Sequence, residues 1–453
     1  MAERTTPKFE LSVDGSPVTA EVIEKVIGIT VRQDVTMADT VEVRISNEDL
    51  RFTEGPTFEE GKTLSVKLGY VETDLVLVGT GTIVRRECEF PERGPAVLTV
   101  VAYDKRFNLK RAVNSKSWTD VKDSDVVSEI CSKVGLSADI DDSRIKHKYL
   151  FQMARTDLAF VAERALQVGF TCVLDRENSK LSFKAPKPGE QAKSTLEWGK
   201  NLLSFRPRFS THDQVGEVEV RGWDMATKKE VKGKATPADA HSKMDLTVFG
   251  TDRTQKAYGK RAMLYPSPAS SSDEAAQIAK SIMNQTLQTF AEGHGSTQGD
   301  NKIQPGLVIE LKAVGVRASG KYFVTGTFHQ YDPKGYTTYF DIVRPGEAPA
   351  PPPPPKKQPA PAPAQGPAQE SGLGTRIDHG GTDEAAGEVG GGVEDAAETA
   401  NASEVGMRIG DPDTSGGGGA AGDLETKIGG PDGPASSGTD GVDSSVSDPT
   451  PPS

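Results

Sequence analysis

Between residues 9 and 113, hydrophobic and polar positions alternate with a period of two, which predicts β-strands with one buried face. Turn-forming stretches rich in Gly, Pro and charged residues separate the alternating segments. Several short strands of this kind predict a small antiparallel barrel. The segments that carry the pattern are 41–46, 64–70, 75–86 and 97–103.

The period then changes to that of a helix. Apolar residues recur at helical spacing from 126 to 134, with Asp123 and Ser124 as candidate caps before them and Gly135 after them. A second helix is predicted at 156–168 and ends at Gly169. Together with a hairpin that follows, these helices predict a separate α+β unit. The hairpin strands are expected at 170–174 and 180–183.

Four short segments recur later in the chain in the same order, which indicates an internal repeat. The pairs are 29–32 with 203–206, 41–44 with 218–221, the strand start at Gly61 with that at Gly306, and 81–83 with 326–328. The second pair is 177 residues apart, whereas the last two are 245 apart. The second copy is therefore interrupted by an insertion between Trp223 and Ile303. That insertion contains a helix predicted from Asp273 to about Phe290.

We therefore expect an α+β fold that is mainly β, with two related antiparallel β-barrels, an α+β unit between them, an α-containing insertion in the second barrel and a disordered C-terminal tail. The expected boundaries are 1–113 for the first barrel, 114–188 for the α+β unit, 189–226 and 303–345 for the second barrel, 227–302 for the insertion and 346–453 for the tail. The positions that carry the barrel repeat are Val41, Val43, Gly61, Gly81, Val218, Val220, Trp223, Gly306 and Gly326.

Composition separates a nearly neutral body from an acidic tail. The chain has 53 basic and 65 acidic residues, of which residues 346–453 hold only five basic but 18 acidic ones. The tail also holds 22 of the 47 glycines and no Phe, Tyr or Trp, so it cannot bury enough apolar surface to offset its chain entropy. The neutral body has no broad basic surface, which argues against specific nucleic-acid binding.

Other sequence features concern the compartment. There is no run of eighteen apolar residues, so no membrane span is expected, and the N-terminus lacks the apolar stretch of a signal peptide. The three cysteines, Cys88, Cys131 and Cys172, are far apart in sequence and match no metal-ligand spacing. We expect them to be reduced, buried thiols of a protein made in a cytoplasm.

No motif predicts catalysis or a cofactor. The six histidines show no zinc-hydrolase spacing, and no pair of carboxylates suggests a glycosidase. The stretch 293–299 lacks the flanking glycines of a nucleophile elbow, and we interpret it as a tight turn that enters a strand. His329 is expected to pack or hydrogen-bond inside a barrel, and Trp223 to be a core or interface aromatic. The sequence thus predicts no catalytic, cofactor-binding or metal-binding residues, and no enzyme.

The tail contains three short patches that pair a cation with isoleucine. One hypothesis is that they are linear docking motifs for another component of a particle, and the alternative is a purely solvating linker. A Pro/Ala-rich stretch at 349–363 precedes them and predicts a polyproline spacer. The patch residues are Arg376 and Ile377, Arg408 and Ile409, and Lys427 and Ile428.

Two similar barrels in one chain have a consequence for symmetry. If three chains closed into a ring, six similar barrels would surround the axis, and a hexameric partner could stack on them. The alternative is a simple duplication that leaves a monomer with two barrels.

Several segments in order resemble one known family. They are 218–224, Gly293 to Gly306, 320–326 and 329–336, preceded by 120–135 and 156–160. Together they resemble the late-control protein D family, the baseplate or tail hub of contractile-tailed phages, and the hub half of VgrG, the spike protein of type VI secretion. The resemblance covers residues 10 to 345, but no needle domain follows, which implies a separate spike protein.

The resemblance implies a structural function. A homotrimer of pseudo-sixfold symmetry would join the hexameric tail tube to the trimeric spike, with the tail tube protein or tube initiator, the spike protein and baseplate wedge components as partners. It would assemble in the bacterial cytoplasm and become part of a virion tail or a contractile injection particle. The alternatives are a tail-associated cell-wall hydrolase, and an adaptor or effector carrier that uses the C-terminal tail.

Overall fold

The computed structural model describes residues 6–175, 180–188, 190–239, 244, 246 and 248–347. All of them belong to the first of two compact units, Met1–Ala360. The polyproline stretch and the three tail patches at Arg376–Ile377, Arg408–Ile409 and Lys427–Ile428 lie outside the described residues.

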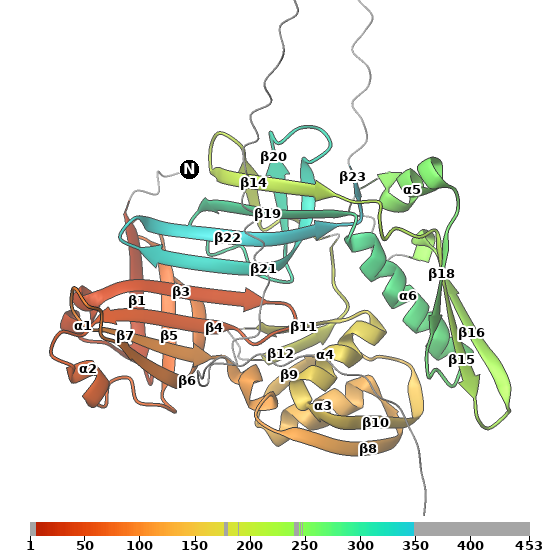
Figure 1. The fold of residues 1–453 in the computed structure, drawn as a ribbon, viewed down its shortest axis with the longest axis horizontal. Helices are drawn as coiled ribbons and strands as arrows, with labels where there is room; N and C mark the ends of the chain where they lie inside the picture. The colour runs from red at the N-terminus through yellow and green to blue at the C-terminus, as the bar shows by residue number, and fades with distance from the viewer. Residues whose placement is uncertain are drawn as a thin grey trace, which may run out of the picture. The chain divides into compact units, whose positions relative to one another are not determined.

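The N-terminal part forms half of a large antiparallel sheet (Figure 1). Its elements are β1 (Pro7–Val13), β2 (Ser16–Pro17), α1 (Ala20–Lys25), β3 (Val26–Asp34), β4 (Thr40–Ser46), α2 (Arg51–Glu54), β5 (Thr63–Tyr70), β6 (Val76–Glu89) and β7 (Val97–Tyr103). Valine, leucine and isoleucine at alternate positions of these strands are fully buried in one core. The period-two pattern is therefore the inward face of the sheet.

A short 3-10 helix, η1 (Lys105–Leu109), leads into the α+β unit. The unit contains β8 (Val113–Lys122), α3 (Asp123–Lys133), β9 (Ser137–Ile140), β10 (Lys146–Thr156), α4 (Asp157–Val168), β11 (Thr171–Asp175) and β12 (Lys180–Lys184). Both helices lie where the spacing of apolar residues places them. The Thr156 side chain caps α4, and Gly169 ends it in the left-handed conformation with φ 76°.

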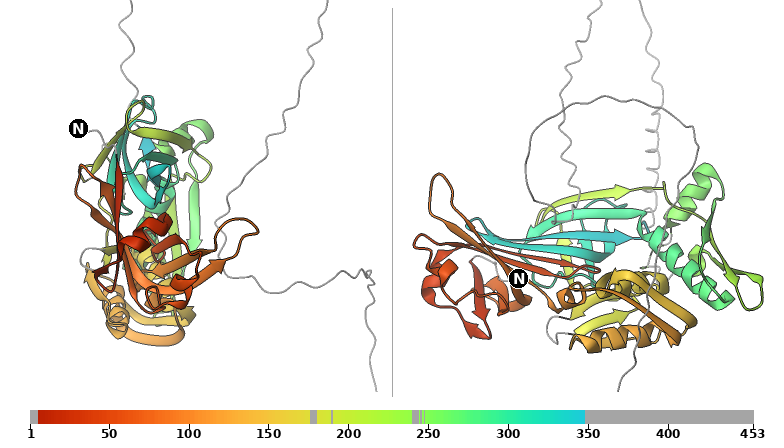
Figure 2. Two further views of the ribbon diagram at one scale, coloured as in Figure 1. Left: turned by 90° about the vertical axis from the view of Figure 1, so that its left-hand side faces the viewer. Right: turned by 60° about the horizontal axis from the view of Figure 1, so that its bottom comes forward.

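The second half of the sheet is built from strands on either side of an insertion. Its strands are β13 (Ser194–Glu197), β14 (Leu202–Phe209), β19 (Ala291–Gln298), β20 (Val308–Lys312), β21 (Gly320–Asp332) and β22 (Gly335–Arg344). The insertion contains β15 (Glu217–Asp224), β16 (Lys229–Ala235), β17 (Val248–Phe249), α5 (Gly250–Tyr258), β18 (Ala262–Pro266) and α6 (Ser272–Gln288). α6 packs on β15 and β16, and it also contacts α4 of the α+β unit (Figure 2).

The two halves have the same strand order. In the first half the order is β3-β4-β7-β6-β5, and in the second it is β14-β19-β22-β21-β20. Numbered along the chain, each is 1-2-5-4-3, and every pair within these two sets is antiparallel. The chain therefore contains a structural repeat.

The halves are joined edge to edge, because β3 pairs with β21, so that 13 strands form one sheet. Among the described strands, no ladder joins β3 back to β5 in the first half. The closure of each half into a barrel stays a prediction.

The predicted pair 41–44 with 218–221 is wrong. Val218, Val220 and Trp223 lie in β15, which belongs to a separate three-stranded sheet with β16 and β18, so they are not equivalent to Val41 and Val43. The counterpart of β4 is β19, which the sequence placed in the insertion. The valines at 218 and 220 are buried, but against α6. Alternation shows that a strand has a buried face, and it does not show which sheet the strand joins.

The glycines of β19 predicted a tight turn, but the structure shows that they lie in a strand and make room for aromatic rings. A Cβ on Gly293 would lie 2.6 Å from the Phe205 ring, and one on Gly295 would overlap the Phe340 ring and lie 2.9 Å from the Ser204 carbonyl oxygen. These glycines let large aromatic side chains of the neighbouring strands lie flat on the middle of the sheet.

We predict that Gly295→Ala destabilises the protein by about 1–3 kcal/mol, because overpacking forces buried neighbours to move. The measurement is urea unfolding followed by tryptophan fluorescence. Gly216→Ala is the matched control, because its Cβ would meet only the Arg261 carbonyl oxygen at 3.6 Å. Equal stability of Gly295→Ala and the wild type would contradict the packing described for β19.

Candidate assembly interface

The repeat can be placed residue by residue, because both halves carry the same two β-bulges. One bulge lies between Val26 and Gly28 in β3 and between Leu202 and Ser204 in β14. The other lies between Ile83 and Arg85 in β6 and between Val324 and Gly326 in β21. Bulges interrupt a ladder at defined positions, so matched bulges fix the equivalence of the strands that carry them.

A turn hydrogen bond confirms this register. The Gly61 N–H donates to the Ile83 carbonyl at 2.8 Å, and the Gly306 N–H donates to the Val324 carbonyl at 2.9 Å. Both glycines have positive φ, 93° and 87°. Gly61 and Gly306 therefore occupy equivalent places in this register. Gly81 is not equivalent to Gly326, because the same register aligns Arg85 with Gly326. The predicted pair 29–32 with 203–206 is wrong by two residues, because the first bulge aligns 29–32 with 205–208.

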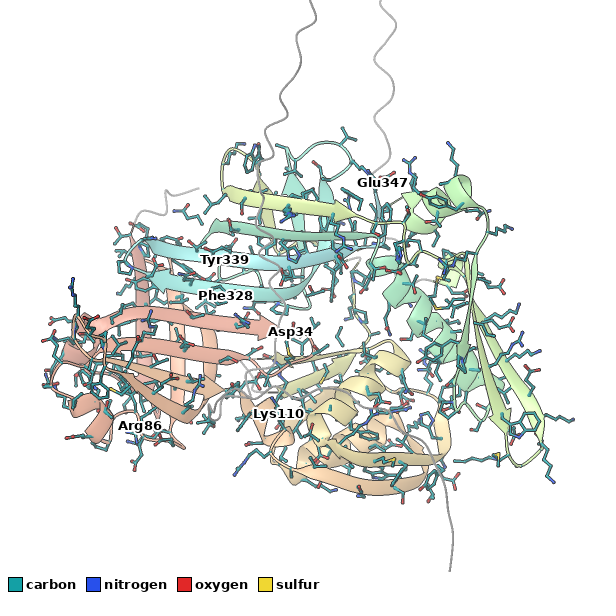
Figure 3. All side chains as sticks on the ribbon, viewed as in Figure 1. Asp34, Arg86, Lys110, Phe328, Tyr339 and Glu347 are labelled. Atoms are coloured by element: carbon teal, nitrogen blue, oxygen red, sulfur yellow. The ribbon has the colours of Figure 1, made fainter. Side chains whose placement is uncertain are left out.

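The junction between β3 and β21 is the contact that joins the two halves (Figure 3). At its centre, the buried Gln33 amide donates to the Val78 carbonyl at 2.6 Å and accepts from the Thr327 hydroxyl at 2.7 Å. On the outer face, the Arg32 guanidinium lies over the Phe328 ring, 5.4 Å from its centroid. The junction thus combines a backbone ladder, a buried hydrogen-bonded pair and a cation–π contact.

His329 lies at the same junction, opposite Val31. It is fully buried, and its Nδ1 is 2.9 Å from the Tyr336 hydroxyl and 3.1 Å from the Thr338 hydroxyl. His329 was predicted to pack or hydrogen-bond inside a barrel. It is buried and hydrogen-bonded within the sheet, and the closure of that sheet into a barrel stays a prediction.

A buried arginine fixes the first half-sheet to the α+β unit. The Arg106 guanidinium donates to Asp104 at 2.9 Å, to Asp39 at 2.7 Å and to the Cys172 carbonyl of β11 at 3.0 Å. All three side chains are at most 3 % exposed, and two carboxylates surround one cation. Removal of one partner would leave an uncompensated buried charge, so this cluster holds the two parts in one geometry.

A second buried cluster joins the α+β unit to the insertion. His147 of β10 contacts Asp123 of α3 through Nε2 at 2.8 Å and Glu274 of α6 through Nδ1 at 2.9 Å. Arg164 of α4 also pairs with Asp123. With a protonated imidazole, the cluster holds two positive and two negative charges, and it is neutral.

The charges in this cluster set the pKa values. Burial alone would lower the pKa of His147, but the hydrogen bonds to Asp123 and Glu274 outweigh burial and raise it to about 9. Burial would raise the pKa of Asp123 and of Glu274, but His147 lowers both, with Arg164 acting on Asp123 as well. Both imidazole nitrogens lie within hydrogen-bond distance of carboxylates, so His147 links α3 of the α+β unit to α6 of the insertion.

A third cluster fixes the end of the described chain. Glu347, 3 % exposed, accepts from Arg253 of α5 and from Arg317, each at 2.6 Å (Figure 3). It lies in β23 (Gly346–Glu347), which pairs with β17. The ordered body therefore extends past the predicted boundary at 345. The two arginines are distant in sequence, so no local signal marks Glu347.

The other residues singled out in the sequence, Trp223 and the three cysteines, differ in how far they are buried. Trp223 is 50 % exposed and is not a core residue, which leaves the interface alternative. Cys131 and Cys172 are buried, and burial raises their pKa values to about 12 and about 11. Cys88 is only partly buried, which differs from the expectation.

The described residues also offer little for metal or acid–base chemistry. They contain no group of three or more His, Cys, Asp or Glu arranged to hold a metal ion. Every described carboxylate with a shifted pKa has it lowered, whereas a general acid needs it raised. None of the described helices has the length and apolar character that a membrane crossing requires.

Comparison with protein families gives one assignment. A family model described as the Alg8 N-terminal domain matches residues 3–332, which is most of the chain. The chain belongs to the Alg8 N-terminal domain family. No curated protein matches it. The resemblance to the late-control protein D family stays a prediction, because the family model that matches is a different one.

Solved structures share this fold. The chain is similar to the 43 kDa tail protein of prophage MuSo2 from Shewanella oneidensis, with a TM-score of 0.57 and 12% identity, over 75% of this chain and 99% of that one. A tail protein from Neisseria meningitidis MC58 has a TM-score of 0.55 and 14% identity, over 75% and 97% of the two chains. The E. coli c3393 protein, a type VI secretion component, has a TM-score of 0.50 and 13% identity, over 75% and 79%. The described part of the chain thus has a phage-tail-protein fold.

We predict that protonated His147 makes stability fall as pH rises. A raised pKa means that the contribution is complete below about pH 6.5 and is lost as pH rises through about 9. The loss should be on the order of 2–3 kcal/mol in the free energy of unfolding. Urea unfolding between pH 6 and pH 9.5 measures it, and His147→Gln should be less stable at pH 6 and nearly independent of pH in this range.

His212→Gln is the matched control, because that imidazole is 87 % exposed. It should retain the wild-type pH dependence. If His147→Gln retained it too, the cluster would not be the source of the effect.

Proposed function

We propose that this chain is the structural hub of a contractile phage tail or of a phage-tail-like injection system. Three copies form a ring of pseudo-sixfold symmetry that joins a hexameric tail tube to a trimeric spike. The partners are the tube protein or tube initiator, a separate spike protein and baseplate wedge components.

The observation that carries the proposal is the repeat of strand order and bulge position within one chain. Two copies of one five-stranded pattern give each protomer two similar surfaces, and a ring of three protomers would present six. Six similar surfaces suit a sixfold partner, and three identical chains suit a threefold one. The phage-tail-protein fold supports the same function.

The buried ion pairs between parts of the chain also support this function. The Arg106, His147 and Glu347 clusters connect the first half-sheet, the α+β unit, the insertion and the last described strand. A hub that transmits force between a tube and a spike requires fixed geometry between its parts. Buried charge pairs provide it, because a displaced partner leaves a charge without compensation.

The alternative, a cell-wall hydrolase, requires a carboxylate pair or a nucleophile with a base. His147 lies between two carboxylates that raise its pKa, and every described carboxylate with a shifted pKa has it lowered. A zymogram on peptidoglycan separates the two functions. We expect no clearing, and clearing that one Asp or Glu substitution abolishes would favour the hydrolase.

We predict that the full chain, in complex with its tube protein or at high concentration, has three times the mass of one chain. Native mass spectrometry gives the mass, and electron microscopy of the complex should show threefold or sixfold rings. An assembled particle with one or two copies would contradict the hub. The docking motifs of the tail lie outside the described residues and remain a prediction.

A further inference from the structure

Two strand edges of the large sheet, one on β14 and one on β6, are covered by no described strand. β14 pairs only with β19, so its outer edge is open. β6 pairs with β5 as far as Thr82, and beyond that residue it pairs only with β7, so the edge next to residues 85–89 is open as well. In Figure 1 these strands lie at opposite ends of the stack that runs from β14 through β3 to β6. An uncovered edge is a template for pairing with another chain.

The internal repeat indicates which strand can pair with each of these open edges. β3 is equivalent to β14, and β21 is equivalent to β6, because each pair shares a bulge. Within the chain, β3 pairs with the part of β21 that follows its bulge, residues 326–331. That part corresponds to the open edge of β6. The contact already made once inside each chain can therefore be made again, by β14 of one copy with β6 of the next.

The register of the internal junction fixes the partners in the external one. In the internal junction, Arg32 faces Phe328, Thr30 faces Gln330 and Val31 faces His329. In the contact between copies, the equivalent residues place Arg208 opposite Glu87, Arg206 opposite Glu89 and Pro207 opposite Cys88.

These translated partners have complementary charges. Arg206, Arg208, Glu87 and Glu89 are all exposed. Arg208 has only a long contact to Glu292, at 3.8 Å, and Glu87 has one to Arg85, at 3.9 Å. Opposite charges placed directly across from each other stabilise a strand pair, and like charges destabilise it.

We propose that β14 of one copy pairs antiparallel with residues 85–89 of β6 of a second copy, with Arg208 opposite Glu87 and Arg206 opposite Glu89. The contact joins two different surfaces, so its repetition forms a ring when the rotation between copies closes, as the proposed trimer requires. The inference rests on the proposed function only for the number of copies, three. Pro207 fits an edge strand, because it lacks one donor, and the ladder between copies is accordingly short by one hydrogen bond.

A single substitution tests the register. Pro207→Cys would place a thiol opposite the native Cys88 of the neighbouring copy, and paired residues in a strand ladder have Cα distances of about 4.5–5.5 Å, within disulfide range. We expect mild oxidation of the full chain to give covalent species of two and three chains on a non-reducing gel. Cys131 and Cys172 are 1 % exposed and should not react.

The control is Pro207→Cys with Cys88→Ser, which has the same new thiol without its partner and should stay a single chain. Crosslinking in Pro207→Cys alone supports the interface. A trimer by native mass spectrometry without crosslinking would overturn the interface and leave the hub intact. A monomer at every concentration would overturn both the trimer and the interface.

Charge exchange gives a second readout that does not depend on thiols. Arg208→Glu and Glu87→Arg should each weaken the trimer about tenfold, because a pair of like charges then meets in every interface. The combined variant Arg208→Glu/Glu87→Arg should regain most of the affinity, measured by sedimentation velocity over a concentration series. Lys229→Glu, an exposed charge reversal in β16, is the matched control and should have no effect. Failure of the combined variant to recover, with both single variants weakened, would place these residues outside a shared contact.

Discussion

The described structure depends on the pairing of β3 with β21. A half-sheet of five strands ends in an edge whose N–H and C=O groups need partners. In this chain the edge of the first half is covered by the second half, and buried Gln33 hydrogen-bonds across the junction to Thr327. The two repeats thus become one continuous sheet, and their relative orientation is fixed by a ladder of main-chain hydrogen bonds instead of a linker.

The other parts are positioned on that sheet by buried charges. Arg106 lies between Asp39 and Asp104 at the exit of the first half, and His147 lies between Asp123 and Glu274 where the α+β unit meets α6. Such clusters contribute little net stability compared with an apolar core, since desolvation offsets their attraction. We expect them to favour one arrangement of the parts, because an arrangement that separates the partners leaves a buried charge unpaired.

The sequence predicted the local elements better than their assignment to sheets. The helices at 123–133 and 157–168 follow from apolar spacing and their glycine ends, and the turn glycines Gly61 and Gly306 follow from a shared segment. β15 was assigned to the wrong sheet because Val-Glu-Val-Arg is an ordinary strand pattern. β19 was missed because its glycines, which accommodate Phe205 and Phe340, resemble a turn.

The residues of the candidate interface could not be predicted from the sequence either. The pairing proposed for Arg208 and Glu87 follows from strand register. That register depends on two β-bulges, which no residue type in the sequence predicts. Likewise, the three charge clusters join residues that are distant along the chain, such as His147 and Glu274, so no spacing in the sequence points to them. Only the folded chain brings these groups together.

The β3–β21 contact inside the chain and the proposed β14–β6 contact between copies differ in the residues that face each other, and this difference has a physical explanation. Inside the chain, Arg32 meets an aromatic ring, Phe328, and the covalent connection of the halves keeps the partners at high effective concentration. Between copies no such connection exists, and the equivalent arginine, Arg208, meets a carboxylate. Complementary charge increases the rate of encounter and disfavours the wrong pairing of two identical edges, since β14 against β14 would set arginine against arginine. A duplicated contact can in this way serve as a core inside the chain and as a selective interface outside it.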